Sequence, residues 1–275
     1  MSRLATRMHA LRAAGHKALA TFITAGDPDR EATVPALHAL VAGGADILEL
    51  GIPFSDPEAE GPTIQASSER GLASGMTLRG CLDMVRTFRQ EDSATPIVLM
   101  GYLNSVMAMG FATFAAAAAD AGVDGLIMVN LPPEEAGELK SELDSHGIDL
   151  IFLVAPTTTP ERAKMILSHS SGFVYYVSLK GITGAGHLVA DSVADKVAAL
   201  RSAGSLPVLV GFGIKDAATA RIVARHADGV VVGSAIVDTM AGHADPESRL
   251  RALKAQVGAL RKALDADVTE SARHD

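Results

Sequence analysis

Tryptophan is absent from the 275-residue sequence, and Phe, Tyr and Trp together make up only 4% of it. The hydrophobic core must therefore consist mainly of Ala, Val, Leu and Ile, which agrees with a hydrophobic content of 48%. A chain of this length and composition is expected to form one large globular domain or two small ones.

Cysteine and positive charge are also scarce. The only cysteine, Cys81, cannot form an internal disulfide, which favours a reducing, cytoplasmic location. Cys81 itself fits a small buried hydrophobic residue better than a nucleophile. The net charge of −8 argues against a protein that binds nucleic acid through phosphate contacts.

Long hydrophobic runs are missing as well. No apolar stretch approaches the roughly 18 residues of a membrane span. The first fifteen residues, MSRLATRMHALRAAG, contain Arg throughout and no apolar core, so they predict an amphipathic helix rather than a signal peptide. The alanine-rich segment Phe111–Gly122 is interrupted by Asp120 and predicts a tightly packed helix. We therefore expect a soluble protein that does not enter a membrane.

Short apolar runs alternate with helical patterns along the chain. The runs are continuously apolar, as in parallel sheets that are covered on both faces. Between them, several helical stretches begin at Asp or Thr and end in Gly, the expected helix start and stop signals. The predicted strands are Ala18–Thr24, Ile47–Leu50, Ile97–Met100, Gly125–Val129, Leu150–Val154, Phe173–Ser178, Pro207–Gly211 and Gly229–Gly233.

Eight strands, each followed by a helix, predict a closed (β/α)8 barrel, the TIM-barrel fold. The alternative is a doubly wound open sheet. The long interval after the second strand contains TIQASSERGLASG (63–75), which predicts an added short helix, and a last helix is expected at about Asp245–Leu264. No linker divides the chain, so we expect a single barrel domain over residues 1–266 and a polar tail over 267–275.

Three glycine-rich segments follow predicted strands: SLKGITGAG (178–186), GFGI (211–214) and VVGSAI (231–236). Active sites of barrels lie at the carboxyl ends of the strands, and phosphate is often held by the last two loops. Glycine lets backbone N–H groups approach an anion, and a short helix that starts after Gly233 and Ser234 would add its dipole. These loops predict phosphate binding, although glycines at such positions can also serve only to make tight turns.

Acidic residues gather in ELGIPFSDPEAEGPTIQ, from Glu49 to Gln65. Glu49 ends an apolar strand, where desolvation would raise its pKa and make it a usable general acid or base; the alternative is a structural ion pair. Of Asp56, Glu58 and Glu60, at most one is expected to be functional. Histidines are scattered, so no metal site is predicted, and Lys180 in a glycine-rich loop fits a solvated or phosphate-facing role better than a Schiff base.

Over nearly its whole length the sequence resembles the alpha subunit of tryptophan synthase. The resemblance implies a (β/α)8 barrel with an extra N-terminal helix and short extra helices after strands 2 and 8, and no metal or cofactor. The matching segments are FITAGDPD (22–29), ADILELGIPFSDPEAEGPTIQASSERGL (45–72), PIVLMGYLN (96–104), GVDGLIMVNLPPEEAGEL (122–139), FLVAPTTTPER (152–162), GFVYYVSLKGITGAG (172–186), VGFGIKDAATA (210–220) and ADGVVVGSAIV (227–237).

The resemblance implies a lyase that cleaves indole-3-glycerol phosphate to indole and glyceraldehyde 3-phosphate, the alpha reaction of L-tryptophan biosynthesis. Glu49 matches the acid–base residue of the family, and Glu60 stands at the position of the carboxylate that binds the indole N–H. The implied phosphate-binding residues are Gly184, Phe212, Gly213, Gly233 and Ser234. The implied pocket residues are Phe22, Met100, Tyr102, Ile127, Tyr175 and Thr183, with Thr183 on a closing loop.

Four positions depart from the family pattern. Glu60 stands for a usual Asp, Glu58 for an apolar residue, Asn130 for a usual Asp, and His187 for a common Asn. The resemblance implies a tryptophan synthase beta subunit as partner in an alpha2-beta2 heterotetramer, and Glu58 and Asn130 fall on loops that face it, where charge alters partner choice. Two alternatives stay open: a divergent paralogue with weakened activity or another phosphorylated substrate, and a non-catalytic activator of a beta subunit.

Overall fold

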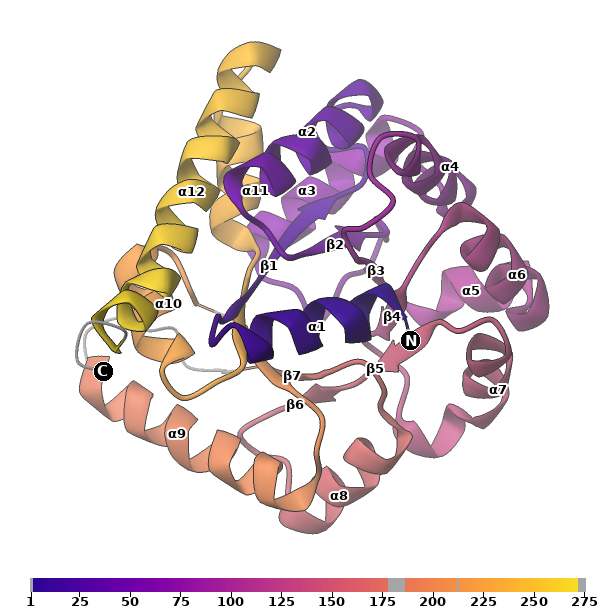
Figure 1. The fold of residues 1–275 in the computed structure, drawn as a ribbon. Helices are drawn as coiled ribbons and strands as arrows, with labels where there is room; N and C mark the ends of the chain where they lie inside the picture. The colour runs from indigo at the N-terminus through magenta and orange to yellow at the C-terminus, as the bar shows by residue number, and fades with distance from the viewer. Residues whose placement is uncertain (1, 178–185, 212, 272–275) are drawn as a thin grey trace.

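Strands and helices alternate along the chain, and each strand runs parallel to its neighbours in the sheet. The computed structural model describes residues 2–177, 186–211 and 213–271, with the side chains of 186–192 and 267–271 excepted. Figure 1 shows the strands as a central barrel with helices around it. The strands are β1 (Ala18–Thr24), β2 (Ile47–Gly51), β3 (Ile97–Gly101), β4 (Gly125–Met128), β5 (Asp149–Ile151), β6 (Leu153–Val154), β7 (Val174–Val177), β8 (Val208–Gly211) and β9 (Gly229–Val232).

The barrel closes at a bend within one predicted strand. The strand order is β5-β4-β3-β2-β1-β9-β8-β7-β6, so β5 and β6 form the two edges of the sheet. Only Phe152 separates β5 from β6, and its carbonyl accepts a hydrogen bond from the Tyr175 N–H at 3.1 Å. The predicted strand Leu150–Val154 therefore pairs with β4 before the bend and with β7 after it. The predicted barrel is confirmed, and the open-sheet alternative is wrong.

The helices surround the barrel, and several begin at the Asp or Thr residues that the sequence marks. The side chains of Asp29, Thr77 and Asp216 each accept a backbone N–H of the helix that follows, as capping residues do. The helices are α1 (Arg3–Ala13), α2 (Arg30–Gly43), α3 (Pro62–Ala73), α4 (Leu78–Arg89), α5 (Leu103–Met109), α6 (Phe111–Ala121), the 3-10 helix η1 (Pro133–Glu135), α7 (Gly137–Ser145), α8 (Pro160–His169), α9 (Gly186–Ala203), α10 (Ala217–Ala224), α11 (Ser234–Gly242) and α12 (Pro246–Ser271).

The helices α3 and α11 are the short extra helices expected after the second and the eighth predicted strands. The helix α5 was not expected from the sequence. Its first N–H, that of Leu103, is bound by the side chain of Asn130 at 2.8 Å, so a residue far along the chain supplies the cap. The helix α12 ends at Ser271, later than the expected Leu264.

Alternating strand residues divide the core into two parts. Leu19 and Ile23 of β1 point outward and pack with the apolar faces of the surrounding helices. Ala20 lies inside the barrel, in a cluster that also contains Leu4 and Met8 of α1. The helix α1 crosses the barrel in Figure 1, and its two buried side chains close the end from which the strands start.

An aspartate stands immediately before three of the strands: Asp46 before β2, Asp124 before β4 and Asp228 before β9. Each carboxylate accepts the N–H of a residue that starts or lies near the start of a neighbouring strand, and each also binds an arginine. Each aspartate therefore ties two adjacent strands together at the base of the barrel. The three N–H donors are Leu19, Ile97 and Val208, each at 2.8 Å from its carboxylate.

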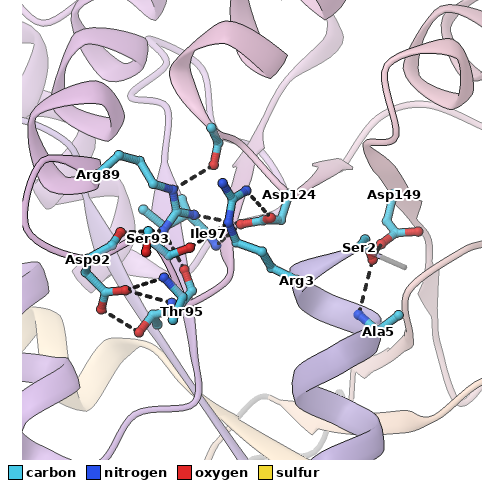
Figure 2. Close-up of polar contacts among 12 residues, drawn as sticks. Ser2, Arg3, Ala5, Arg89, Asp92, Ser93, Thr95, Ile97, Asp124 and Asp149 are labelled. Carbon is cyan, nitrogen blue, oxygen red and sulfur yellow. Dashed lines mark hydrogen bonds and ion pairs between the residues drawn. The ribbon is translucent and has the colours of Figure 1, made fainter.

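Asp124 binds two arginines and a backbone N–H. Figure 2 shows its carboxylate between two arginines, with Arg3 of α1 at 2.9 Å and Arg89 of α4 at 2.7 Å. Arg3 also donates to the carbonyl of Ser93 at 2.8 Å. Because Asp124 is buried, its charge is tolerated only with these partners, and the same contacts hold α1 against the base of the barrel.

Replacing Asp124 is expected to destabilise the protein strongly. In Asp124→Ala the largely buried guanidinium of Arg89 loses its carboxylate partner and the N–H of Ile97 loses its acceptor, which costs about 3–5 kcal/mol. The matched control is Asp120→Ala, because Asp120 is 75% exposed where Asp124 is 3% exposed, yet it also pairs with an arginine. Urea unfolding should place the control within about 0.5 kcal/mol of the wild type. Equal losses in both variants would contradict the structural role of Asp124.

Candidate active site

A cavity of about 660 Å³ lies at the carboxyl end of the barrel strands. Its floor and walls come from alternating strand residues, because side chains that point inward near the end of each parallel strand converge at the barrel mouth. Its rim comes from the segments that lead into α3, α10 and α11. The lining includes Phe22, Glu49, Glu60, Ile64, Met100, Tyr175, Gly213, Lys215, Val231, Gly233, Ser234 and Asp238.

Glu49 lies in the middle of β2 and points into this cavity. Its side chain is fully buried, and neither carboxyl oxygen makes a hydrogen bond with any residue that the structure describes. Burial, with a further contribution from the charge of Glu60, raises the pKa of Glu49 from 4.5 to about 8. At neutral pH the side chain is therefore mainly a neutral carboxylic acid that is able to donate a proton.

Glu60 reaches the same cavity from the loop before α3. Partial burial raises the pKa of this carboxyl as well. The loop is held on both sides of Glu60: the Gln65 side chain donates to the Glu60 carbonyl at 2.8 Å, and the Ala59 N–H donates to the Tyr102 hydroxyl at 3.0 Å. The ring of Phe54 stacks on Tyr102 with centroids 4.9 Å apart. These contacts give Glu60 a defined place although it lies outside regular structure.

Two strand glycines make room for the aromatic walls of the cavity. A Cβ atom on Gly51 would lie 2.5 Å from the Phe22 ring, and one on Gly211 would collide with the hydroxyl of Tyr175. Any larger residue at either position would push an aromatic ring out of place. The sequence pattern that ends β2 and β8 in glycine thus serves the shape of the cavity.

The glycine-rich end of the cavity is formed by the starts of α10 and α11. Gly213 adopts a φ of +77°, a conformation that favours glycine. Gly233 is the N-cap of α11, and no side chain caps that helix, so its first N–H groups are available to an anion. Gly233, Ser234 and Gly213 all line the cavity, as expected for a phosphate site.

Most of the predicted site residues lie together, and two lie elsewhere. Tyr102 is absent from the lining of the main cavity and lines a smaller space beside it, where it also meets Glu60. Ile127 is buried within the barrel, in the cluster that α1 covers, and is also absent from the lining. Three predicted residues, Thr183, Gly184 and Phe212, lie outside the described residues, as does Lys180.

Sequence reasoning missed several lining residues, among them Ile64, Asp238 and Lys215. Ile64 belongs to the added helix α3, which was predicted but not assigned to the site. Asp238 lies one helical turn after Ser234, and Thr63 donates to its carboxylate at 3.2 Å. Lys215 directly follows GFGI. The positions next to the glycine motifs were the available signal for Asp238 and Lys215.

Two other departures from the family pattern, Glu58 and Asn130, lie on the surface, and the side chain of His187 lies outside the described residues. Asp56 and Glu58 are exposed, as expected for loop residues that do not enter the cavity. Asn130 is also exposed, and its side chain accepts the Leu103 N–H and donates to the Asn104 side chain at 3.3 Å. An amide at this position therefore links the loop after β4 to the start of α5.

Two searches of the described residues returned nothing. No group of three or more His, Cys, Asp or Glu side chains is arranged to hold a metal ion within that part of the chain. Among the helices described there, none combines the length and hydropathy that crossing a bilayer requires.

The sequence profile of the family described as "Tryptophan synthase alpha chain" matches residues 8–265. The chain belongs to the tryptophan synthase alpha chain family. The tryptophan synthase alpha chain of Thioalkalivibrio sulfidiphilus is 57% identical over 266 residues, which are 96% of this chain and 100% of that protein. That of Laribacter hongkongensis is 56% identical over 267 residues, with coverage of 97% and 100%.

Solved structures agree with this membership. A crystal structure of the tryptophan synthase alpha chain from Legionella pneumophila matches with a TM-score of 0.89 at 42% identity, and the match covers 96% of this chain and 98% of that one. The TIM-barrel fold of this tryptophan synthase alpha chain is thus shared with a solved relative.

Glu49 should make folding stability depend on pH. The folded state keeps this proton up to pH about 8, whereas the unfolded chain loses it near 4.5, so the free energy of unfolding falls as pH rises between these values. In Glu49→Gln this fall in the free energy of unfolding with pH is absent. The variant should therefore gain stability relative to the wild type, by on the order of 4 kcal/mol at pH 8, and little at pH 4.

Denaturant unfolding from pH 4 to pH 9 measures this difference. The control is Glu58→Gln, because Glu58 is exposed on the neighbouring loop. Its stability difference from the wild type should stay nearly constant over the same range. A Glu49→Gln difference that is independent of pH would contradict the raised pKa of Glu49.

Proposed function

We propose that the cavity at the carboxyl end of the barrel is where this chain performs its reaction, and that Glu49 and Glu60 are the catalytic residues. As a tryptophan synthase alpha chain, the protein is a carbon–carbon lyase of tryptophan biosynthesis that cleaves indole-3-glycerol phosphate to indole and glyceraldehyde 3-phosphate. The observation that carries the site assignment is the buried carboxyl of Glu49, which faces a cavity that it shares with Glu60.

Glu49 serves as acid and then as base. Its carboxylic acid donates a proton to C3 of the indole ring, which places a positive charge on the ring and its nitrogen. The resulting carboxylate takes the proton of the glycerol hydroxyl, the carbon–carbon bond breaks, and its electron pair returns to the ring. A pKa of about 8 suits this role, since the acid form is present at neutral pH and the proton is still exchangeable.

Glu60 stabilises the charge that develops on the indole nitrogen. An ionised carboxylate that accepts the ring N–H is worth most when the ring is cationic, so it favours the intermediate over the bound substrate. Burial first, and the charge of Glu60 second, raise the pKa of Glu49 so that it holds the proton, and Glu60, which is less buried, is the residue that ionises. No metal or cofactor takes part in this scheme.

The remaining contacts divide between the two ends of the substrate. The phosphate rests on Gly213, Gly233 and Ser234 at the starts of α10 and α11, together with Gly184 and Phe212. Phe22, Met100 and Tyr175 form the apolar walls around the indole and glycerol, with Ile127 beneath, and Thr183 is the further pocket residue that the family pattern gives. Tyr102 contributes by holding the loop of Glu60 through the Ala59 N–H.

We also propose a partner and a setting. The family pairs with a tryptophan synthase beta subunit, which supports an alpha2-beta2 heterotetramer for this chain, in the cytoplasm. Glu58 and Asn130 are exposed and therefore available to that partner, whose surface is expected to complement their altered charge. Residues 1–266 act as one barrel domain and 267–275 as a tail. No observation favours a divergent substrate or a non-catalytic activator.

Removing the acid function of Glu49 should abolish most of the activity. Glu49→Gln keeps the shape of the side chain but holds no transferable proton, so kcat should fall by about 10²–10⁴ with KM within about threefold. In the wild type, kcat/KM should fall as pH rises above about 8, where Glu49 ionises. Indole release by the isolated chain is the assay, with Glu58→Gln as control. Retained activity in Glu49→Gln would refute the catalytic role of this residue.

The activity should depend on the charge of the side chain at position 60 more than on its length. Glu60→Gln removes the carboxylate and should lower kcat by about 10²–10³. Glu60→Asp retracts the carboxylate by one methylene, which can cost up to ~10²-fold if the loop does not adjust. We expect Glu60→Asp to retain at least about tenfold more activity than Glu60→Gln. Equal activity in the two variants would show that the charge of Glu60 is not used.

A further inference from the structure

The charges around the cavity are unevenly distributed. Three carboxyl groups line it: Glu49 in β2, Glu60 in the loop before α3, and Asp238 on α11. Among the described lining residues, Lys215 is the only one with a basic side chain. The protein as a whole carries a net charge of −8. An anionic substrate therefore approaches a cavity that is acidic apart from one lysine.

Lys215 lies at the glycine-rich end of the cavity. It follows β8 by four residues and comes two residues after Gly213, whose φ is +77°. Directly after it, Asp216 caps α10 by accepting the Thr219 N–H at 2.8 Å. The backbone of Lys215 is thus set between a glycine turn and a capped helix, and its side chain is exposed at the rim. It makes no ion pair with another described residue.

The phosphate of the substrate needs more positive charge than the backbone offers. A phosphate monoester carries about −1.5 to −2 charges near pH 7, whereas a helix N-terminus offers roughly +0.5. The carboxyls of Glu60 and Asp238 oppose its entry. A lysine carries a point charge on a flexible side chain, which suits binding to phosphate. At an exposed rim its electrostatic attraction extends over about one Debye length, which is about 8 Å at physiological salt.

We propose that Lys215 binds the phosphate group of the substrate at the rim of the cavity and draws the anion toward the starts of α10 and α11. The proposal rests on the proposed function of the cavity. It gives Lys215 a role in binding and association, and none in the proton transfers at Glu49. Substituting Lys215 should therefore change KM and the salt dependence of kcat/KM, and it should leave kcat unchanged.

Substitutions of Lys215 test this role in the full-length chain. Lys215→Gln should raise KM for indole-3-glycerol phosphate by about fivefold, Lys215→Glu should raise it by about twentyfold or more, and Lys215→Arg should stay near the wild type. In all three, kcat should stay within about twofold. The fall of kcat/KM with added salt should be shallower in Lys215→Gln than in the wild type. The control is Lys164→Gln, because Lys164 is exposed on α8 and does not line the cavity.

A binding measurement distinguishes an effect of Lys215 on the phosphate end of the substrate from an effect on the indole end. Calorimetry should show that Lys215→Gln binds glycerol 3-phosphate about fivefold more weakly, while its affinity for indole, which has no charge, is unchanged. Equal weakening of both ligands would show that Lys215 shapes the cavity and does not bind phosphate. Unchanged KM and unchanged glycerol 3-phosphate binding in Lys215→Glu would overturn the proposal.

These outcomes are distinct from a failure of the proposed function. If wild-type protein binds glycerol 3-phosphate and indole but releases no indole from indole-3-glycerol phosphate, the proposed reaction fails and the role of Lys215 is still decided by the calorimetry. If the wild type cleaves the substrate and Lys215→Glu behaves like it in every measurement, the role of Lys215 fails and the reaction stands.

Discussion

The structure depends on keeping one ionisable side chain, Glu49, inside the barrel without a hydrogen-bonding partner among the described residues. Burial of this kind costs free energy of folding. An unpaired carboxylate is too unfavourable inside the barrel, and even the neutral acid loses its hydrogen bonds to water. It persists because β2 cannot shift: one residue of slip would turn Glu49 outward and bring Leu48 or Leu50 into the cavity. The parallel register with β1 and β3 therefore determines the chemistry of the site as well as the fold.

The base of the barrel supplies the rigidity that the site requires. Asp46, which immediately precedes β2, binds Arg7 at 2.7 Å, Arg261 at 2.9 Å and the Leu19 N–H at 2.8 Å. These contacts hold β2 at the end opposite to the cavity, so Glu49 projects from a strand whose start is anchored. The acidic residues at the base are thus ion-paired and stabilise the fold, whereas the carboxyls of Glu49 and Glu60 at the mouth have raised pKa values, as catalytic groups often do.

The sequence predicted the parts of the structure that follow from local patterns. The apolar runs located every strand, because buried parallel strands have no polar face, and the Asp and Thr caps located several helix starts. The exceptions had non-local causes: α5 is capped by Asn130 from another loop, and the predicted strand Leu150–Val154 bends at Phe152 because its two ends pair with different neighbours. Ile127 and Tyr102 were placed in the pocket by family resemblance, whereas the strand pleat and loop packing of this chain put them beside or beneath it.

The sequence by itself determined the (β/α)8 barrel, the family, and the placement of Glu49 within a buried strand, because each of these depends on residue type and spacing within short segments. Only the tertiary structure decided that Glu49 and Glu60, eleven positions apart, share one cavity, that Gly51 and Gly211 leave space for Phe22 and Tyr175, and that Lys215 and Asp238 reach the same rim. These contacts depend on closure of the barrel, which brings β1, β2, β7 and β9 around a common axis. Local sequence patterns do not indicate which side chains come together at the mouth of the barrel.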